Sequence, residues 1–176
     1  MTKHLVLLGD SIFDNGVYVE PGQANVTAHL ERKLPPIGWT LDMRAVDGDV
    51  TSSVEGQLSQ RPVVTPCTFV LSVGGNDALG HMDMIMDPTP NRTVGEVLAE
   101  FHQIREAFRE RYTGALNLIM DHDQPLIVCT IYNPQFPDTD VQKLAAAGLS
   151  FLNDVITEDA LRVNFPLSCF LETCHK

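Results

Sequence analysis

The feature of this sequence that most restricts its fold is a regular alternation of short apolar runs with longer segments of helical periodicity. The short runs lie at residues 4–8, 39–46, 68–73 and 126–132, with a weaker one at 165–174. Runs of this length, bounded by turn residues, are typical of buried strands. Strands that alternate with helices predict a parallel sheet covered by helices on both faces. We therefore expect an α/β protein with a parallel sheet of about five strands.

The segments between these runs predict the helices. Three of them begin with Ser or Thr followed three residues later by Glu or Gln, the pattern of a capping box. These pairs are Ser52 with Glu55, Thr93 with Glu96, and Thr139 with Gln142. Behind the last two, apolar residues recur at three- and four-residue steps, which predicts two long amphipathic helices. A further helix is expected at 22–33 and a loop at 78–90.

Composition limits the class of partner. The chain has 176 residues with no repeat or linker, so residues 1–176 are expected to form a single domain. Twelve basic residues against 23 acidic ones give a net charge of -11, which disfavours nucleic acid and membrane surfaces as partners. No apolar run approaches the roughly 18 residues of a membrane span. The first apolar run is too short for a signal peptide, so a cytoplasmic location is expected.

Candidate functional residues follow three of the predicted strands, at the edge of a parallel sheet where ligands bind. The first strand leads into Gly9-Asp10-Ser11, the second is followed by Gly48, and the third leads into Gly74-Gly75-Asn76-Asp77. Ser11 is a possible nucleophile if a base takes its proton. Gly48 offers a backbone N–H and Asn76 a side-chain amide. Taken singly, each is equally an ordinary turn residue.

Together, G-D-S-I, a glycine after the second strand and G-G-N-D resemble the SGNH hydrolases, also called the GDSL family, over about residues 4–163. The resemblance implies a flavodoxin-like three-layer α/β/α fold and hydrolysis of esters, thioesters or acetylated sugars without a cofactor. Ser11 matches the family nucleophile. The backbone N–H groups of Ser11 and Gly48 and the Asn76 amide match its three-donor oxyanion hole. Asp10 and the Asp14-Asn15 pair match flanking positions with turn and support roles.

The sequence departs from the family in its general base. The family carries an Asp-x-x-His near its C-terminus, and no histidine of this chain has an Asp three places earlier. The nearest match is Glu172-Thr173-Cys174-His175, which nominates His175 as the base and Glu172 as its orienting carboxylate. The domain is therefore expected to be incomplete at its C-terminus. His81 is the only internal histidine expected at the same sheet edge as Ser11.

Three hypotheses follow. The first is a serine ester hydrolase acting on a small-molecule ester, with an apolar acyl pocket shaped by Met82, Met84 and Met86. The second is a family member truncated or altered at its C-terminus, with little or no turnover, that acts at most as a binding domain. The third is a nucleotide- or flavin-binding module, which the sequence disfavours because neither G-x-G-x-x-G nor the P-loop pattern occurs.

Overall fold

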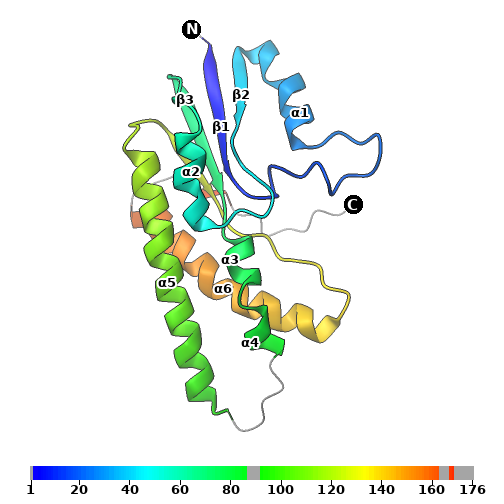
Figure 1. Ribbon diagram of the computed structural model, residues 1–176, viewed down its shortest axis with the longest axis vertical. Coiled ribbons are helices and arrows are strands. Elements are labelled where there is room, and N and C mark those ends of the chain that lie inside the picture. Colours follow the sequence, from blue (N-terminus) through cyan, green and yellow to red (C-terminus); the bar gives the residue numbers. More distant parts are fainter. Residues whose placement is uncertain (1, 87–91, 163–166, 169–176) are drawn as a thin grey trace.

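The computed structural model describes residues 2–86, 92–162 and 167–168, and its centre is a parallel sheet (Figure 1). The strands are β1 (Lys3–Gly9), β2 (Trp39–Met43), β3 (Cys67–Ser72), β4 (Leu126–Cys129) and β5 (Leu167–Ser168). They lie in the order β2-β1-β3-β4-β5, and each neighbouring pair is parallel. This is the strand order of flavodoxin-like folds, so the predicted fold class is confirmed. Two residues of β5 fall within the described ranges, so four strands carry most of the pairing described there.

Helices cover both faces of the sheet, and the alternation of side chains along β1 shows how. The helices are α1 (Val26–Lys33), α2 (Val54–Ser59), α3 (Gly75–Leu79), α4 (Met82–Met86), α5 (Val94–Met120) and α6 (Thr139–Arg162), with 3₁₀ helices η1 (Pro35–Ile37) and η2 (Thr51–Ser53). Val6 and Leu8 face the larger core, beneath α2, α5 and α6. Leu5 and Leu7 face the other side, where α1 packs (Figure 1). Successive strand residues point to opposite faces, so one apolar run serves both cores.

One of the three predicted capping boxes is confirmed. At the start of α5, the Thr93 N–H donates to Glu96 Oε2 at 2.7 Å and the Glu96 N–H donates to Thr93 Oγ at 3.2 Å. The prediction for Thr139 and Gln142 is wrong because Asp138 caps α6 instead. Its carboxylate accepts the N–H groups of two first-turn residues, at 2.8 and 3.0 Å.

The prediction of a capping box at Ser52 and Glu55 is also wrong. Residues 51–53 form the 3₁₀ helix η2, and α2 begins only at Val54. Ser53 accepts the N–H of Val50 through its hydroxyl at 3.3 Å. The tighter 3₁₀ turn therefore occupies the positions where the sequence pattern places the first α-helical turn.

Two strands end three residues earlier than predicted, each for a different reason. β2 ends at Met43 because the regular ladder is interrupted there: the N–H groups of Arg44 and Ala45 both donate to the Leu7 carbonyl, each at 3.0 Å. The Arg44 side chain is buried and donates to the carbonyls of Leu58, Arg61 and Pro62. β4 ends at Cys129.

Beyond β4, the backbone of Ile131 pairs with a side chain of α6 rather than with a strand. Its N–H donates to Asn153 Oδ1 at 2.8 Å, and its carbonyl accepts from Asn153 Nδ2 at 2.9 Å. The chain after β4 is thereby held against α6 in a loop.

Three further segments differ from prediction. The helix expected at 22–33 begins at Val26, since Asn25 caps it by accepting the Ala28 N–H at 2.8 Å. Helices α3 and α4 occupy part of the loop expected at 78–90. Of the fifth strand expected at 165–174, the structure describes Leu167–Ser168, and the other residues lie outside the described part. No helix in the described ranges is both long and apolar enough to cross a membrane.

Candidate active site

The loops that follow β1, β2 and β3 meet at one edge of the sheet. β1 and β3 pair from end to end, so Gly9 lies directly beside Ser72. The approach is so close that a Cβ built on Gly9 would lie 1.7 Å from the Ser72 carbonyl oxygen, and the φ of Gly9 is +133°. Only glycine is compatible with this contact, which brings the residues after Gly9 next to the loop after β3.

Gln57, on α2, joins the loops after β1 and β2. Its amide oxygen accepts the Gly9 N–H at 2.9 Å, and its amide nitrogen donates to the Gly9 carbonyl at 2.7 Å and to Asp49 Oδ2 at 2.6 Å. A second link comes from Asp14, whose carboxylate accepts the Asp47 N–H at 3.0 Å. Both loops are therefore fixed by buried or half-buried hydrogen bonds rather than by packing alone.

Asn76 and Asp77 join the loop after β3 to the loop after β2. Asn76 Nδ2 donates to the backbone carbonyl of Asp49 at 2.8 Å. The buried Asp77 carboxylate accepts both the N–H and the hydroxyl of Thr51, each at 2.8 Å. An amide nitrogen carries two N–H groups. The bond to Asp49 uses one of them and fixes the orientation of the other.

Asp10 lies beneath these loops and is buried, with 4% of its surface exposed. Burial, which penalises the charged carboxylate, raises the pKa of Asp10 from 3.8 to about 6. Hydrogen bonds from the N–H groups of Ile12 and Gly75 oppose this rise, and the negative charges of Asp77 and Asp47 add to it. The carboxylate thus connects the loop that carries Ser11 to the loop that carries Asn76.

Ser11 and Gly48 present backbone N–H groups at this edge. Ser11 is half-buried, and Gly48 is exposed with a φ of +85°, a left-handed conformation that favours glycine. Within the described residues, neither N–H has a hydrogen-bond partner. Gly48 directly precedes Asp49, whose carbonyl accepts from Asn76. The structure therefore brings together the three loops that carry Ser11, Gly48 and Asn76.

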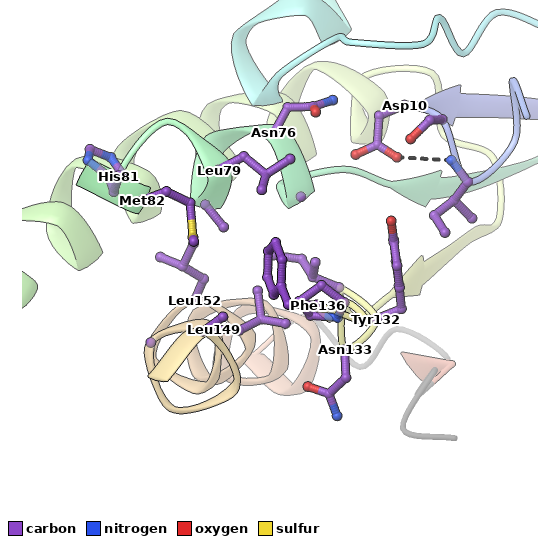
Figure 2. Close-up of a pocket in the computed structure, with 18 of the residues that line it drawn as sticks. Asp10, Asn76, Leu79, His81, Met82, Tyr132, Asn133, Phe136, Leu149 and Leu152 are labelled. Atoms are coloured by element: carbon purple, nitrogen blue, oxygen red, sulfur yellow. Dashed lines mark hydrogen bonds between the residues drawn. The ribbon is translucent and has the colours of Figure 1, made fainter. Parts of the chain in front are cut away.

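A pocket of about 800 Å³ opens beside Ser11 and Asn76, which both line it. Figure 2 shows apolar side chains from α3, α4 and α6 converging on this space, with Asp10 near one end of it. The apolar lining residues include Leu79, Met82, Met84, Phe101, Ile104, Phe136, Leu149, Phe151 and Leu152. Met82 and Met84 thus line a pocket, as the sequence suggested, and the side chain of Met86 lies outside the described part of the structure. Gly48 is not among the described residues that line it.

The described histidines are distributed unequally around this site. His4 contacts Thr40 at the start of β1, and His122 packs on Phe69 near the start of β4, so both lie at the opposite edge of the sheet. His81 lines the pocket, but Figure 2 shows it at the end away from Asp10.

The remaining histidines are less informative about the base. His29 contacts Arg32 on α1, and His102 is exposed on α5. The predicted base His175 and its partner Glu172 lie outside the described residues.

Comparison with known proteins identifies the family. The model of the GDSL-like lipase/acylhydrolase family matches residues 7–174. The chain belongs to this family. The predicted family is therefore confirmed, and it is a family of hydrolases. No curated protein matches this GDSL-family chain.

Solved structures of the same fold are similar to this GDSL-family chain at low sequence identity. Phospholipase A1 from Streptomyces albidoflavus is 18% identical with a TM-score of 0.65, over 95% of this chain and 79% of that one. An extracellular lipase from Streptomyces rimosus is 18% identical with a TM-score of 0.62, over 96% and 80%. An acetyl xylan esterase from Geobacillus stearothermophilus is 15% identical with a TM-score of 0.59, over 93% and 74%. At such identities the likeness concerns the fold.

Sequence reasoning missed two groups of residues in this GDSL-family site. Gln57 and Thr51 support the loops, but each acts on residues far away in the chain, and no local pattern signals that. The pocket residues Phe101 and Ile104 belong to the apolar stripe of α5, which predicted core packing. The apolar stripe of α5 is longer than the predicted strands that it would cover. This excess length is the signal that could have identified Phe101 and Ile104 as pocket residues.

Proposed function

We propose that this GDSL-family hydrolase is a serine esterase in which Ser11 is the nucleophile. One observation carries the proposal: Ser11 and Asn76 line the same pocket, while the N–H groups of Ser11 and Gly48 have no partner within the described residues. Unpaired donors beside a candidate nucleophile are what an oxyanion hole requires.

In the proposed reaction, the Ser11 hydroxyl oxygen attacks the acyl carbonyl carbon while its proton passes to a base. The negative charge that develops on the carbonyl oxygen is stabilised by the Ser11 N–H, the Gly48 N–H and the second N–H of the Asn76 amide. The tetrahedral intermediate collapses, and the alcohol leaves with the proton from the base. Water then attacks the acyl-enzyme, and the acid is released while Ser11 regains its proton.

The proposed base is His175, oriented by Glu172, because no described histidine is favoured as the partner of Ser11. His4 and His122 belong to the opposite edge of the sheet, and His81 to the other end of the pocket. The second candidate function is that of a family member that binds esters with little turnover. It is favoured by the same positions of the described histidines. Both candidates share Ser11, the loops and the pocket, and they differ in whether His175 reaches the site.

The proposed substrate is a small-molecule ester, and the proposed location is the cytoplasm. A net charge of -11 disfavours polyanionic partners. Acyl transfer by a serine, a histidine and an oxyanion hole needs no cofactor.

The test is labelling with a fluorophosphonate probe, which reacts only with an activated serine. We expect the wild type to be labelled and Ser11→Ala to remain unlabelled. Ser59→Ala, on the exposed side of α2, is the matched control and should be labelled like the wild type. Labelling of Ser11→Ala at the wild-type rate would refute the assignment of the nucleophile.

A further inference from the structure

We infer that the substrate carries a medium-length acyl chain, octanoyl to dodecanoyl, and that this chain lies in the pocket between α4, α5 and α6. The inference rests on the proposed function, because it places the ester carbonyl at Ser11. It adds the class of acyl group. Short acyl groups such as acetyl are excluded as preferred substrates.

The first observation is that the pocket is continuous from the nucleophile to the far turns of α5. Ser11 and Asn76 line one part of it, and Ile104 and Phe101 line another. Figure 2 shows Leu79, Met82, Leu149 and Leu152 around the same space. A chain attached to a carbonyl at Ser11 can therefore extend along this space without crossing the protein.

The second observation is the length of the pocket. Phe108 of α5 lies against Gly74, next to the loop of Asn76, because two of its ring atoms are 3.1 Å from where a Gly74 Cβ would be. Phe101 is two turns earlier on the same helix, which corresponds to roughly 10 Å along its axis. Phe108 and Gly74 do not line the pocket, so this span runs from the level of the Asn76 loop to the pocket lining at Phe101. It is close to the length of an extended octanoyl chain. The volume of about 800 Å³ lies near the upper end of small-molecule sites, so it has room for an acyl chain of eight to twelve carbons.

The third observation is the chemistry of the walls. The lining contributed by α4, α5 and α6 consists of methionine, phenylalanine, isoleucine, leucine and small residues. Among the described residues that α4, α5 and α6 contribute to the lining, none carries a charge. Burial of methylene groups is the interaction that such walls offer.

The fourth observation is that the two helical walls are fixed to each other. The rings of Phe101 on α5 and Phe151 on α6 stack with centroids 5.0 Å apart. Further along, Arg105 and Arg109 of α5 both pair with Glu158 of α6, at 2.8 and 2.5 Å. The pocket is therefore largely formed before a ligand arrives, which lowers the cost of binding.

The kinetic test compares p-nitrophenyl acetate with p-nitrophenyl octanoate, below the concentration at which the octanoate forms micelles. We expect kcat/KM for the octanoate to exceed that for the acetate by about a hundredfold or more, because its six additional methylene groups are buried against apolar walls. In Ile104→Trp, where the indole fills the pocket, the octanoate-to-acetate ratio should fall at least tenfold. Leu118→Trp, on the same helix and outside the pocket, should keep the wild-type ratio.

A second variant and a second measurement separate failure of this inference from failure of the proposed function. The variant is Met82→Trp, on the short helix α4, which replaces Ile104→Trp if the latter does not fold. Calorimetric titration of Ser11→Ala with methyl nonyl ketone, a neutral ester analogue, should show binding that acetone lacks and that either tryptophan variant weakens.

The outcomes are distinct. Absence of ketone binding, or Ser11-dependent hydrolysis with no preference for octanoate, overturns the inference and leaves the proposed esterase intact. Ketone binding without any Ser11-dependent hydrolysis supports the pocket and counts against the esterase.

Discussion

At the scale of single residues, Asn76 has two roles, and the loss of each can be measured separately in one variant. Its amide donates to Asp49 and, in the proposed reaction, to the oxyanion. We expect Asn76→Ala to lower kcat by about 10²-fold or more, as loss of one oxyanion donor does. The lost bond to Asp49 should cost only about 1 kcal/mol of stability.

The measurement for Asn76 is kcat for p-nitrophenyl ester hydrolysis, together with thermal unfolding. The Asn25→Ala variant is a control for the loss of a structural asparagine, since Asn25 caps α1 and is not among the described residues that line the pocket. An unchanged kcat in a folded Asn76→Ala protein would reduce Asn76 to a loop residue.

Asp10 predicts a pH dependence of stability. Its folded pKa of about 6 lies above the ordinary 3.8, so the folded protein binds the proton more tightly than the unfolded chain does. Stability from this group is therefore greatest below pH 3.8 and decreases as the pH rises towards 6. Relative to Asp10→Asn, which does not titrate, the wild type should lose about 2 kcal/mol of unfolding free energy between pH 4 and 7.

Urea unfolding of both proteins across this pH range measures the difference directly. A constant difference, or one that grows in favour of the wild type as the pH rises, would contradict the assigned pKa.

The sequence was sufficient to nominate Ser11, Gly48 and Asn76 because each follows a predicted strand within a recognisable motif. It could not nominate Gln57. A glutamine in a short helix has no distinguishing local pattern, and its role exists only because Gly9, 48 residues away, lies against it. Residues such as Gln57, which support other residues, can be identified only from the contacts in the folded structure.

At the scale of the elements, prediction succeeded where an element is defined by its own residues and failed where a distant side chain defines its end. The apolar runs located β1 to β4, and Thr93 with Glu96 located the start of α5. Asn153 shortened β4 through a contact across the molecule, and β2 is interrupted where the Arg44 and Ala45 N–H groups share the Leu7 carbonyl of β1. The early apolar residues of α5 are partly exposed, with Val94 at 76%, because the helix extends beyond the sheet.

The end of β1 gives a prediction about an element. Gly9→Ala places a methyl group against the Ser72 carbonyl and strains a φ of +133°, so we expect a loss of more than about 3 kcal/mol or failure to fold. Gly56→Ala in α2 is the matched comparison. No atom lies within 4 Å of its added Cβ, and we expect a gain of about 0.5–1 kcal/mol.

Chemical denaturation of the two glycine variants, monitored by far-UV circular dichroism, gives both values. Similar small effects at both positions would show that β1 and β3 can separate at this edge without cost.

At the scale of the whole molecule, the rule of right-handed crossovers was enough to predict which strands are parallel and that helices cover both faces. It could not predict the pocket. The pocket exists because α5 and α6 run together beyond the sheet edge, where Phe101 meets Phe151 instead of a strand. Apolar periodicity alone does not reveal whether a stripe faces a core or a cavity.

The last prediction concerns the base, which has to come from a segment more than 150 residues away from Ser11 in the chain. If His175 accepts the Ser11 proton, His175→Ala should lower kcat by about 10²-fold or more, the usual contribution of a positioned general base. Glu172→Gln should lower kcat by a comparable factor, because a neutral amide holds the imidazole in the wrong tautomer even where it preserves the geometry. His81→Ala tests the one described histidine that lines the pocket, and exposed His102 serves as the control through His102→Ala. A decrease of less than tenfold in His175→Ala, with Ser11 still needed for the remaining activity, would favour the family member with little turnover. The rate would then reflect the oxyanion hole and substrate binding alone, which by themselves leave roughly 10³–10⁴-fold catalysis over water.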